Sequence, residues 1–115
     1  MTEESKAKST KLTIKDRFMI REVLPQHGTL VDQILAVDVD RKVAFNQAEI
    51  EEIGLKQEGT TIAWKDDATL EKEVEFSGAE LEFIDRQIKR MSGEGLITRD
   101  MVDTILKLQS MMRVS

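Results

Sequence analysis

Few side chains in this 115-residue chain could do chemistry. There is one histidine, His27, and one tryptophan, Trp64, while cysteine and tyrosine are absent. Without cysteine the chain cannot form disulfides, use a thiolate nucleophile or bind zinc through sulfur. A lone histidine without a nucleophile or a second base beside it makes no catalytic constellation. The sequence therefore predicts a non-enzymatic protein that works by contact, with no catalytic residue, no metal ligand and no cofactor.

Three groups of polar residues could still form a binding site. His27 and Gly28 precede a predicted helix start, where backbone amides can bind an anion. Asp38 and Asp40 have the spacing of the first two ligands of a calcium loop, but the central glycine and closing glutamate are missing. The other carboxylates cluster at Glu49, Glu51 and Glu52, at Asp66 and Asp67, and at Glu71, Glu73 and Glu75. We interpret all three groups as solvated turns, helix caps and polar faces, and whether any of them binds a ligand stays open.

Composition and charge narrow the class of protein. Hydrophobic residues make up 40% and charged residues 34% of the chain, which suits one compact domain. The net charge is −5, and lysine and arginine are interspersed with acids, whereas binding to a duplex needs a clustered basic face. No apolar run approaches the roughly 20 residues of a membrane-spanning helix. We therefore expect a cytoplasmic protein that binds neither nucleic acid nor membrane.

The elements that position these residues follow from caps and periodicity. Residues 1–11 contain little to bury and predict a flexible tail, followed by a single α+β domain over residues 12–115. Apolar residues at helical spacing predict helices over 13–24, 29–44, 46–52, 77–91 and 98–112. Their N-caps are Thr13, Thr29, Asn46, Ser77 and Thr98. Alternation within 53–76 predicts a central antiparallel sheet of two or three strands, with a hairpin turn at Glu58-Gly59.

The apolar faces of these elements predict the core and one antiparallel helix pair. The short connection between 77–91 and 98–112 makes the last two helices antiparallel neighbours. The second helix is expected to bury Leu30, Val31, Ile34, Leu35, Val39 and Val43. The predicted core residues are Phe18, Leu24, Leu35, Phe45, Ile62, Trp64, Phe76, Leu81, Ile84, Ile88, Ile105 and Leu108.

The C-terminal end of the chain is the predicted contact surface. Met111, Met112 and Val114 form an apolar end to the last helix, and flexible methionines suit an adaptable interface. Left uncovered, they would add to the kind of exposed apolar patch that marks association sites. We therefore expect a protein partner, with a homodimer as the simplest case.

The order of several structural landmarks resembles that of a known family. The chain is similar, over about residues 11–108, to small uncharacterised proteins encoded by phages and prophages. The residues that carry the resemblance are Lys11-Leu12-Thr13, Arg17, Leu24-Pro25, Gly28, Phe45, Glu49, Gly59, Trp64, Lys72-Glu73-Val74-Glu75-Phe76, Ile84, Ile88 and Leu96-Ile97-Thr98. The resemblance implies a phage or prophage origin and a non-enzymatic accessory role. It assigns no site residue.

Two other functions stay open at this point. One is a small enzyme or ligand-binding protein with an acidic pocket near Trp64. The other is an acidic mimic of nucleic acid, which would need its carboxylates gathered on one face.

Overall fold

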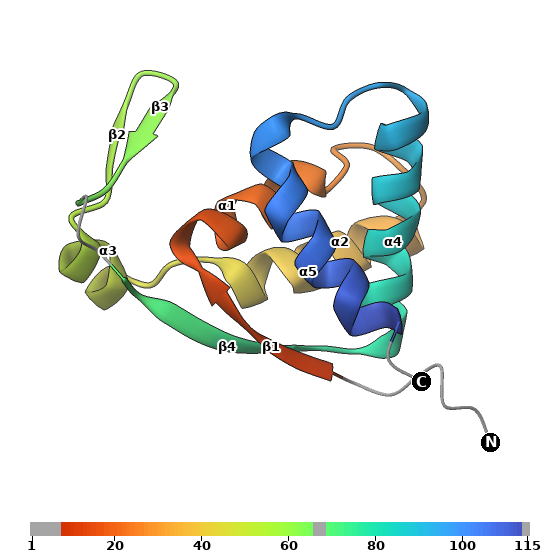
Figure 1. Cartoon of the computed structure of the whole chain (residues 1–115), viewed down its shortest axis with the longest axis horizontal. Helices are drawn as coiled ribbons and strands as arrows, with labels where there is room; N and C mark the ends of the chain where they lie inside the picture. The colour runs from red at the N-terminus through yellow and green to blue at the C-terminus, as the bar shows by residue number, and fades with distance from the viewer. Residues whose placement is uncertain (1–7, 66–68, 114–115) are drawn as a thin grey trace.

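The computed structural model describes residues 8–65 and 69–113 and combines helices with short antiparallel strands (Figure 1). The predicted α+β class is confirmed. Helices α1 and α4 contact each other and are flanked by α2, α5 and the first strand. The elements in chain order are β1 (Lys8–Thr13), α1 (Ile14–Val23), α2 (Leu30–Val43), α3 (Gln47–Ile53), β2 (Lys56–Glu58), β3 (Thr61–Ala63), β4 (Glu71–Phe76), α4 (Gly78–Gly93), the 3-10 turn η1 (Arg99–Met101) and α5 (Val102–Arg113).

Side-chain caps confirm four of the predicted helix starts. The side chains of Thr13, Thr29, Asn46 and Ser77 each accept a hydrogen bond from the backbone N–H three residues on. The prediction for Thr98 is wrong, because its side chain makes no cap hydrogen bond. Its carbonyl instead accepts from the Met101 N–H at 3.0 Å, which closes η1 before α5 begins. A tight first turn has replaced the capped start there.

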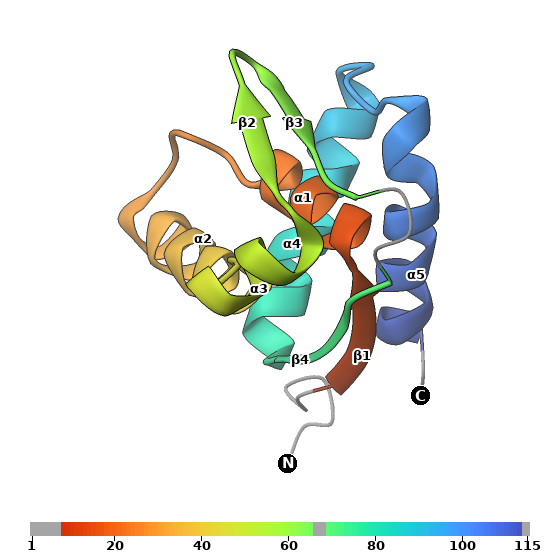
Figure 2. The ribbon, with the colours of Figure 1, turned by 90° about the vertical axis from the view of Figure 1, so that its left-hand side faces the viewer.

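The strands form two separate two-stranded antiparallel sheets. The predicted small sheet within residues 53–76 is confirmed with two strands, whereas β4 does not join it as a third. β1 pairs antiparallel with β4, with Lys8 opposite Phe76 and Thr13 opposite Glu71. The predicted hairpin is confirmed as β2 and β3, which pair only with each other. All residues of these two short strands are exposed, and the hairpin projects from the helical body in both views (Figures 1 and 2).

The predicted tail over residues 1–11 is wrong for residues 8–11, since they belong to β1. Leu12 is the one fully buried residue of this strand. Residues 8–11 are polar, so the sequence shows no alternation of apolar residues that would predict a strand there. Pairing with a strand some sixty residues away and two lysine contacts hold it instead. The Lys8 ammonium donates to the Met111 carbonyl at 2.9 Å, and the Lys107 ammonium donates to the Lys11 carbonyl at 3.1 Å.

The main core lies where α1, α2, α4, α5 and the β1–β4 pair meet. The predicted antiparallel arrangement of α4 and α5 is confirmed in both views (Figures 1 and 2). Predicted core residues that are buried are Phe76, Leu81, Ile84, Ile88, Ile105 and Leu108. Those that are only half-buried are Phe18, Leu24, Leu35, Phe45 and Trp64. The prediction for Ile62 is wrong, because this residue lies on the projecting hairpin and is 43% exposed.

The three half-buried aromatic residues form a stack beside the core. The Phe18 ring centroid lies 5.0 Å from that of Phe45 and 5.5 Å from that of Trp64, with nearly parallel planes. Such offset stacking adds to the stabilisation from buried area. The stack joins α1 to the start of α3 and to the end of β3, and so anchors the base of the hairpin to the body.

Arg17 is a charged residue with only 1% of its surface exposed. Its guanidinium donates to the backbone carbonyls of Val43 and Ala44 and, bidentately, to the Glu49 carboxylate at 3.0 and 2.9 Å. The hydrogen bonds from Arg17 are the largest cause that lowers the pKa of Glu49. One side chain thus satisfies the C-terminal carbonyls of α2 and ties α1 to α3.

Asp16 forms a second buried polar contact between distant elements. It caps α1 with Thr13, accepts from the Thr104 hydroxyl at 2.6 Å and pairs with the Lys107 ammonium. Burial alone would raise the pKa of Asp16, but the hydrogen bonds from Lys107, Thr104 and the Thr13 amide outweigh burial and lower it. The ionised carboxylate is therefore the form that the fold stabilises.

We expect the stability contributed by Asp16 to be lost in acid. Its folded pKa lies below the ordinary value of 3.8, so the contribution is fully present above that value and falls as pH drops through the folded pKa. Urea unfolding between about pH 7 and pH 2 should show that Asp16→Asn costs about 1–3 kcal/mol near neutrality and progressively less in acid. A cost that stayed constant over this range would show that the charge of Asp16 is not involved.

Candidate interaction surface

The outer side of α2 exposes four large aliphatic side chains. Leu30 is 76% exposed, Val31 65%, Ile34 52% and Val37 47%. We call these residues the α2 outer face. The prediction that this helix buries Leu30, Val31 and Ile34 is therefore wrong. Large apolar side chains this close together on a surface mark interaction sites more often than isolated ones do.

The wrong prediction has a simple cause in the sequence of α2. Ala36, Val39 and Val43 form its buried side, at spacings of three and four residues. The exposed residues Leu30, Ile34 and Val37 have the same spacing on the opposite side. A helix that is apolar on two sides shows no single stripe, so periodicity cannot say which side faces inward. The structure shows that the second side faces solvent.

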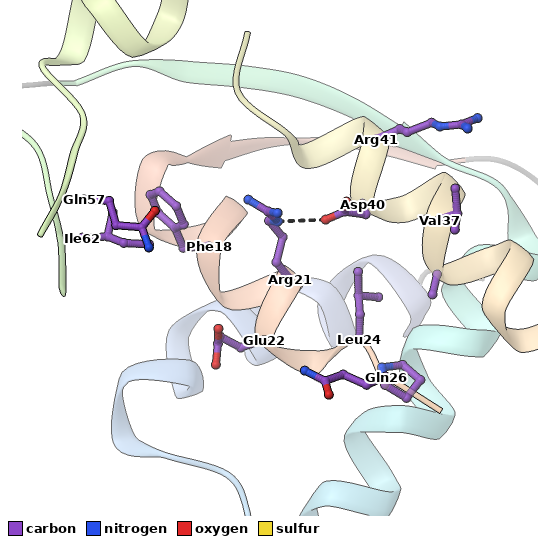
Figure 3. A pocket seen from close by; sticks show the side chains of 12 residues that line it. Phe18, Arg21, Glu22, Leu24, Gln26, Val37, Asp40, Arg41, Gln57 and Ile62 are labelled. Carbon is purple, nitrogen blue, oxygen red and sulfur yellow. Dashed lines mark hydrogen bonds and ion pairs between the residues drawn. The ribbon is translucent and has the colours of Figure 1, made fainter. Parts of the chain in front are cut away.

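A groove of about 680 Å³ runs beside the α2 outer face, between α1, α2 and the β2–β3 hairpin (Figure 3). Its apolar lining consists of Phe18, Leu24, Pro25, Ala36, Val37 and Ile62. Val37 lines the groove and also belongs to the outer face, so the two surfaces are continuous. Ile62, on the hairpin, extends the apolar lining to the opposite wall.

Four charged side chains line the same groove. The Arg21 Nε donates to the Asp40 Oδ1 at 2.8 Å across the floor, drawn as a dashed line in Figure 3. Both side chains of this pair are more than 40% exposed. Glu22 and Arg41 also line the groove, and within residues 8–65 and 69–113 neither makes a side-chain hydrogen bond or ion pair. Among the described residues, the groove thus offers one unpaired charge of each sign beside the Arg21–Asp40 pair.

One of the three residues predicted to form a contact surface at the end of the last helix is buried. Met111 is only 8% exposed and belongs to the core, and Met112 packs against it. The end of α5 lies against β1, where the Lys8 ammonium donates to the Met111 carbonyl, and Met112 is half-buried. Val114 lies outside the described residues. The prediction of an exposed methionine surface is therefore wrong for Met111.

The exposed apolar residues of α5 lie at its other end. Val102 is 41% and Leu106 54% exposed, and both line a groove of about 240 Å³ between α4 and α5. Leu96, in the loop before α5, is 50% exposed. This second surface is smaller than the α2 outer face and its groove.

The other polar groups do not come together in one site. His27 and Gly28 are exposed in the loop before α2, and within the described part of the chain the His27 side chain has no hydrogen-bond partner. Asp38 lies on α2 without a partner there, while Asp40 pairs with Arg21. Asp66 and Asp67 lie outside the described residues.

The glutamates serve the structure locally. The Glu49 carboxylate accepts from the Asn46 N–H at the start of α3 and binds Arg17, and Glu51 accepts from Gln47 one turn away. Glu71, Glu73 and Glu75 lie on the exposed side of β4. No group of three acidic or histidine residues among residues 8–65 and 69–113 could hold a metal ion.

A cavity of about 470 Å³ lies beside Trp64. An acidic pocket near this residue was one of the alternatives that the sequence allowed. Its lining contains one carboxylate, from Glu71, and one ammonium group, from Lys15. The described lining is therefore balanced in charge rather than acidic.

Two further findings concern membrane-spanning helices and similarity to known proteins. None of the helices in the described part is long and apolar enough to cross a membrane. The chain matches no protein-family model, no curated protein and no solved structure. The geometry of the surfaces above therefore carries the functional argument.

Proposed function

We propose that this protein acts by binding another protein through the α2 outer face and the groove beside it. The observation that carries the proposal is the exposure of Leu30, Val31, Ile34 and Val37. Their exposed fractions together exceed two whole aliphatic side chains, so covering them would contribute roughly 4–7 kcal/mol. Because association itself costs about 4–15 kcal/mol, this gain drives binding only together with the apolar surface that the partner buries in the same contact.

The groove supports a binding role in a second way. Six apolar residues of its lining could hold an apolar side chain of a partner, and four charged residues lie among them. The unpaired Arg41 and Glu22 could orient a partner that carries the opposite charges. We place the protein in the non-enzymatic class on these grounds, together with its single histidine and the lack of cysteine and tyrosine.

The cellular setting is part of the same proposal. A small accessory protein of a phage or prophage, which the resemblance implies, would act in the host cytoplasm through such a surface. The proposed binding surface does not depend on that origin, because it is inferred only from the exposure of the α2 residues.

A pair of matched variants tests the proposed function. Ile34 is 52% exposed on the α2 outer face and Leu106 is 54% exposed on the α4/α5 groove, so replacement by glutamate should leave the fold intact at either position. We expect Ile34→Glu to reduce the yield of co-purified partner at least tenfold when the tagged chain is captured from the cells that make it. Leu106→Glu should retain the partner.

The same two variants can also contradict the proposal that the α2 outer face binds the partner. Loss of the partner only with Leu106→Glu would move the binding surface to the α4/α5 groove. Full retention of the partner by both variants would show that neither apolar surface is used. Circular dichroism of each purified variant checks that the helix content is unchanged.

A further inference from the structure

We propose that the occupant of the α2 outer face is the α2 outer face of a second copy, packed antiparallel in a two-fold symmetric dimer. This inference rests on the proposed function and names its partner. It follows from the spacing of the exposed residues, from the position of the charges beside them and from the open side of α2.

The exposed residues have the spacing of a helix–helix seam. Leu30, Ile34, Val37 and Arg41 follow one another at intervals of four, three and four residues along the outer side of α2. This alternation of four and three is the one that packs helices side by side in coiled coils. The row is about 16 Å long. This row can therefore pack against a second helix with the same spacing, and α2 of a second copy is such a helix.

The charge at one end of the row selects the antiparallel direction. In a parallel pair, Arg41 would lie against Arg41 of the second copy, and the two like charges would repel each other. In an antiparallel pair, Arg41 lies against Leu30 of the second copy, at the rim of the contact. There its aliphatic stem can cover the leucine while the guanidinium stays in water. Ile34 then packs on Val37 of the second copy in the centre.

The flanking residues are compatible with the same arrangement. On one side of the antiparallel seam Asp38 faces Val31 of the second copy, and on the other side Asp40 faces Gln33 of the second copy. No two carboxylates meet. Asp40 is already paired with Arg21 in its own chain, at 2.8 Å, so its charge is compensated before the contact forms.

The position of α2 in the fold leaves room for a second copy. α2 lies at the margin of the molecule, and no other element lies beyond it in the view of Figure 2. The exposed fractions of Leu30 and Val31, 76% and 65%, show that this end is the most open part of the row. A contact made by a few helical turns is small for a stable dimer, so we expect a dimer that forms in the micromolar range.

Sedimentation of the full-length chain over about 1 μM to 1 mM tests the dimer directly. We expect the wild-type chain to shift from monomer to dimer over this range. Ile34→Glu should stay monomeric throughout, because each copy would then bury a glutamate carboxylate against Val37 of the other copy at the centre of the contact. Leu106→Glu is the matched control and should dimerise like the wild type. A wild-type chain that remains monomeric over the whole range, or an Ile34→Glu chain that dimerises equally well, overturns the proposal.

Single cysteines test the antiparallel direction, since the natural chain has none. Leu30→Cys and Arg41→Cys should each give little disulfide-linked dimer alone, and an equimolar mixture of the two should give the linked heterodimer under mild oxidation. Efficient linkage of either variant with itself would overturn the antiparallel arrangement.

The results also separate this proposal from the proposed function. A monomeric wild type whose captured partner is lost with Ile34→Glu overturns the dimer but leaves the α2 outer face as a binding surface for a different protein. A monomeric wild type whose partners are unaffected by Ile34→Glu overturns both.

Discussion

Replacing Arg17 with methionine is expected to lower the free energy of unfolding by about 3–5 kcal/mol, because it removes one partner of a buried ion pair. Methionine fills much of the space of the arginine stem but donates no hydrogen bond. The carbonyls of Val43 and Ala44 and the carboxylate of Glu49 would each lose the guanidinium. The guanidinium carbon also lies 3.8 Å from the centre of the Phe45 ring, a contact that methionine replaces only in part.

The matched control for this variant is Arg21→Met on the same helix. Arg21 makes a single ion pair with Asp40 and both side chains are more than 40% exposed, so its replacement should cost less than about 1 kcal/mol. Urea unfolding followed by circular dichroism measures both. Equal losses for the two variants would mean that the buried hydrogen bonds of Arg17 are worth no more than a surface pair.

Replacing Phe83 with alanine is the second large effect, with an expected loss of about 3–5 kcal/mol. The Phe83 side chain is completely buried in the core formed by α4 and its neighbours. Alanine would remove the ring and leave a cavity that the close-packed helices cannot fill. Denaturant unfolding of the variant measures the loss.

Two control variants show whether the loss comes from the cavity left by the Phe83 ring. Phe83→Leu keeps most of the apolar volume and should cost less than Phe83→Ala. Glu82→Ala changes the neighbouring exposed residue and should stay within about 0.5 kcal/mol of the wild type. A loss below about 1 kcal/mol for Phe83→Ala would show that the side chain is less tightly packed than the structure describes.

Local chemistry made much of the fold predictable. The capping boxes at Thr13, Asn46 and Ser77 are confirmed because each depends on residues only three positions apart. The hairpin around Gly59 is confirmed for a similar reason: the turn needs a residue with positive φ, and Gly59 has a φ of 62°. Interactions of this range leave their signal in a short stretch of sequence.

Long-range contacts account for what the sequence did not predict. β1 is held by β4 and α5, so its polar residues 8–11 looked like a tail. Arg17 looked like an ordinary helical arginine, because its acceptors lie 26 to 32 residues away. Phe83 falls beside the main periodic row of α4, and its burial comes from packing between helices. None of these partners can be identified from local spacing.

The candidate surface was missed for a physical reason of its own. An apolar residue on a helix is normally assigned to the core, since burial is what apolar surface favours. On α2 this rule assigned Leu30, Val31 and Ile34 to the inside, although the core was already filled by Ala36, Val39 and Val43. For Met111 the opposite error arose, because its position near the chain end favoured exposure, although it is buried in the core. The sequence did contain one indication of this surface: α2 has more apolar residues than one side of a helix can hold.

Photo-cross-linking in cells tests whether the α2 outer face is the binding surface of the protein. A photoreactive phenylalanine analogue replaces Ile34 in one full-length chain and Leu106 in another, and both are irradiated in the cells that make the protein. We expect a discrete cross-linked protein from position 34, whether a second copy or another protein, and none from position 106. Cross-linking from position 106 alone, or none from position 34, would contradict it.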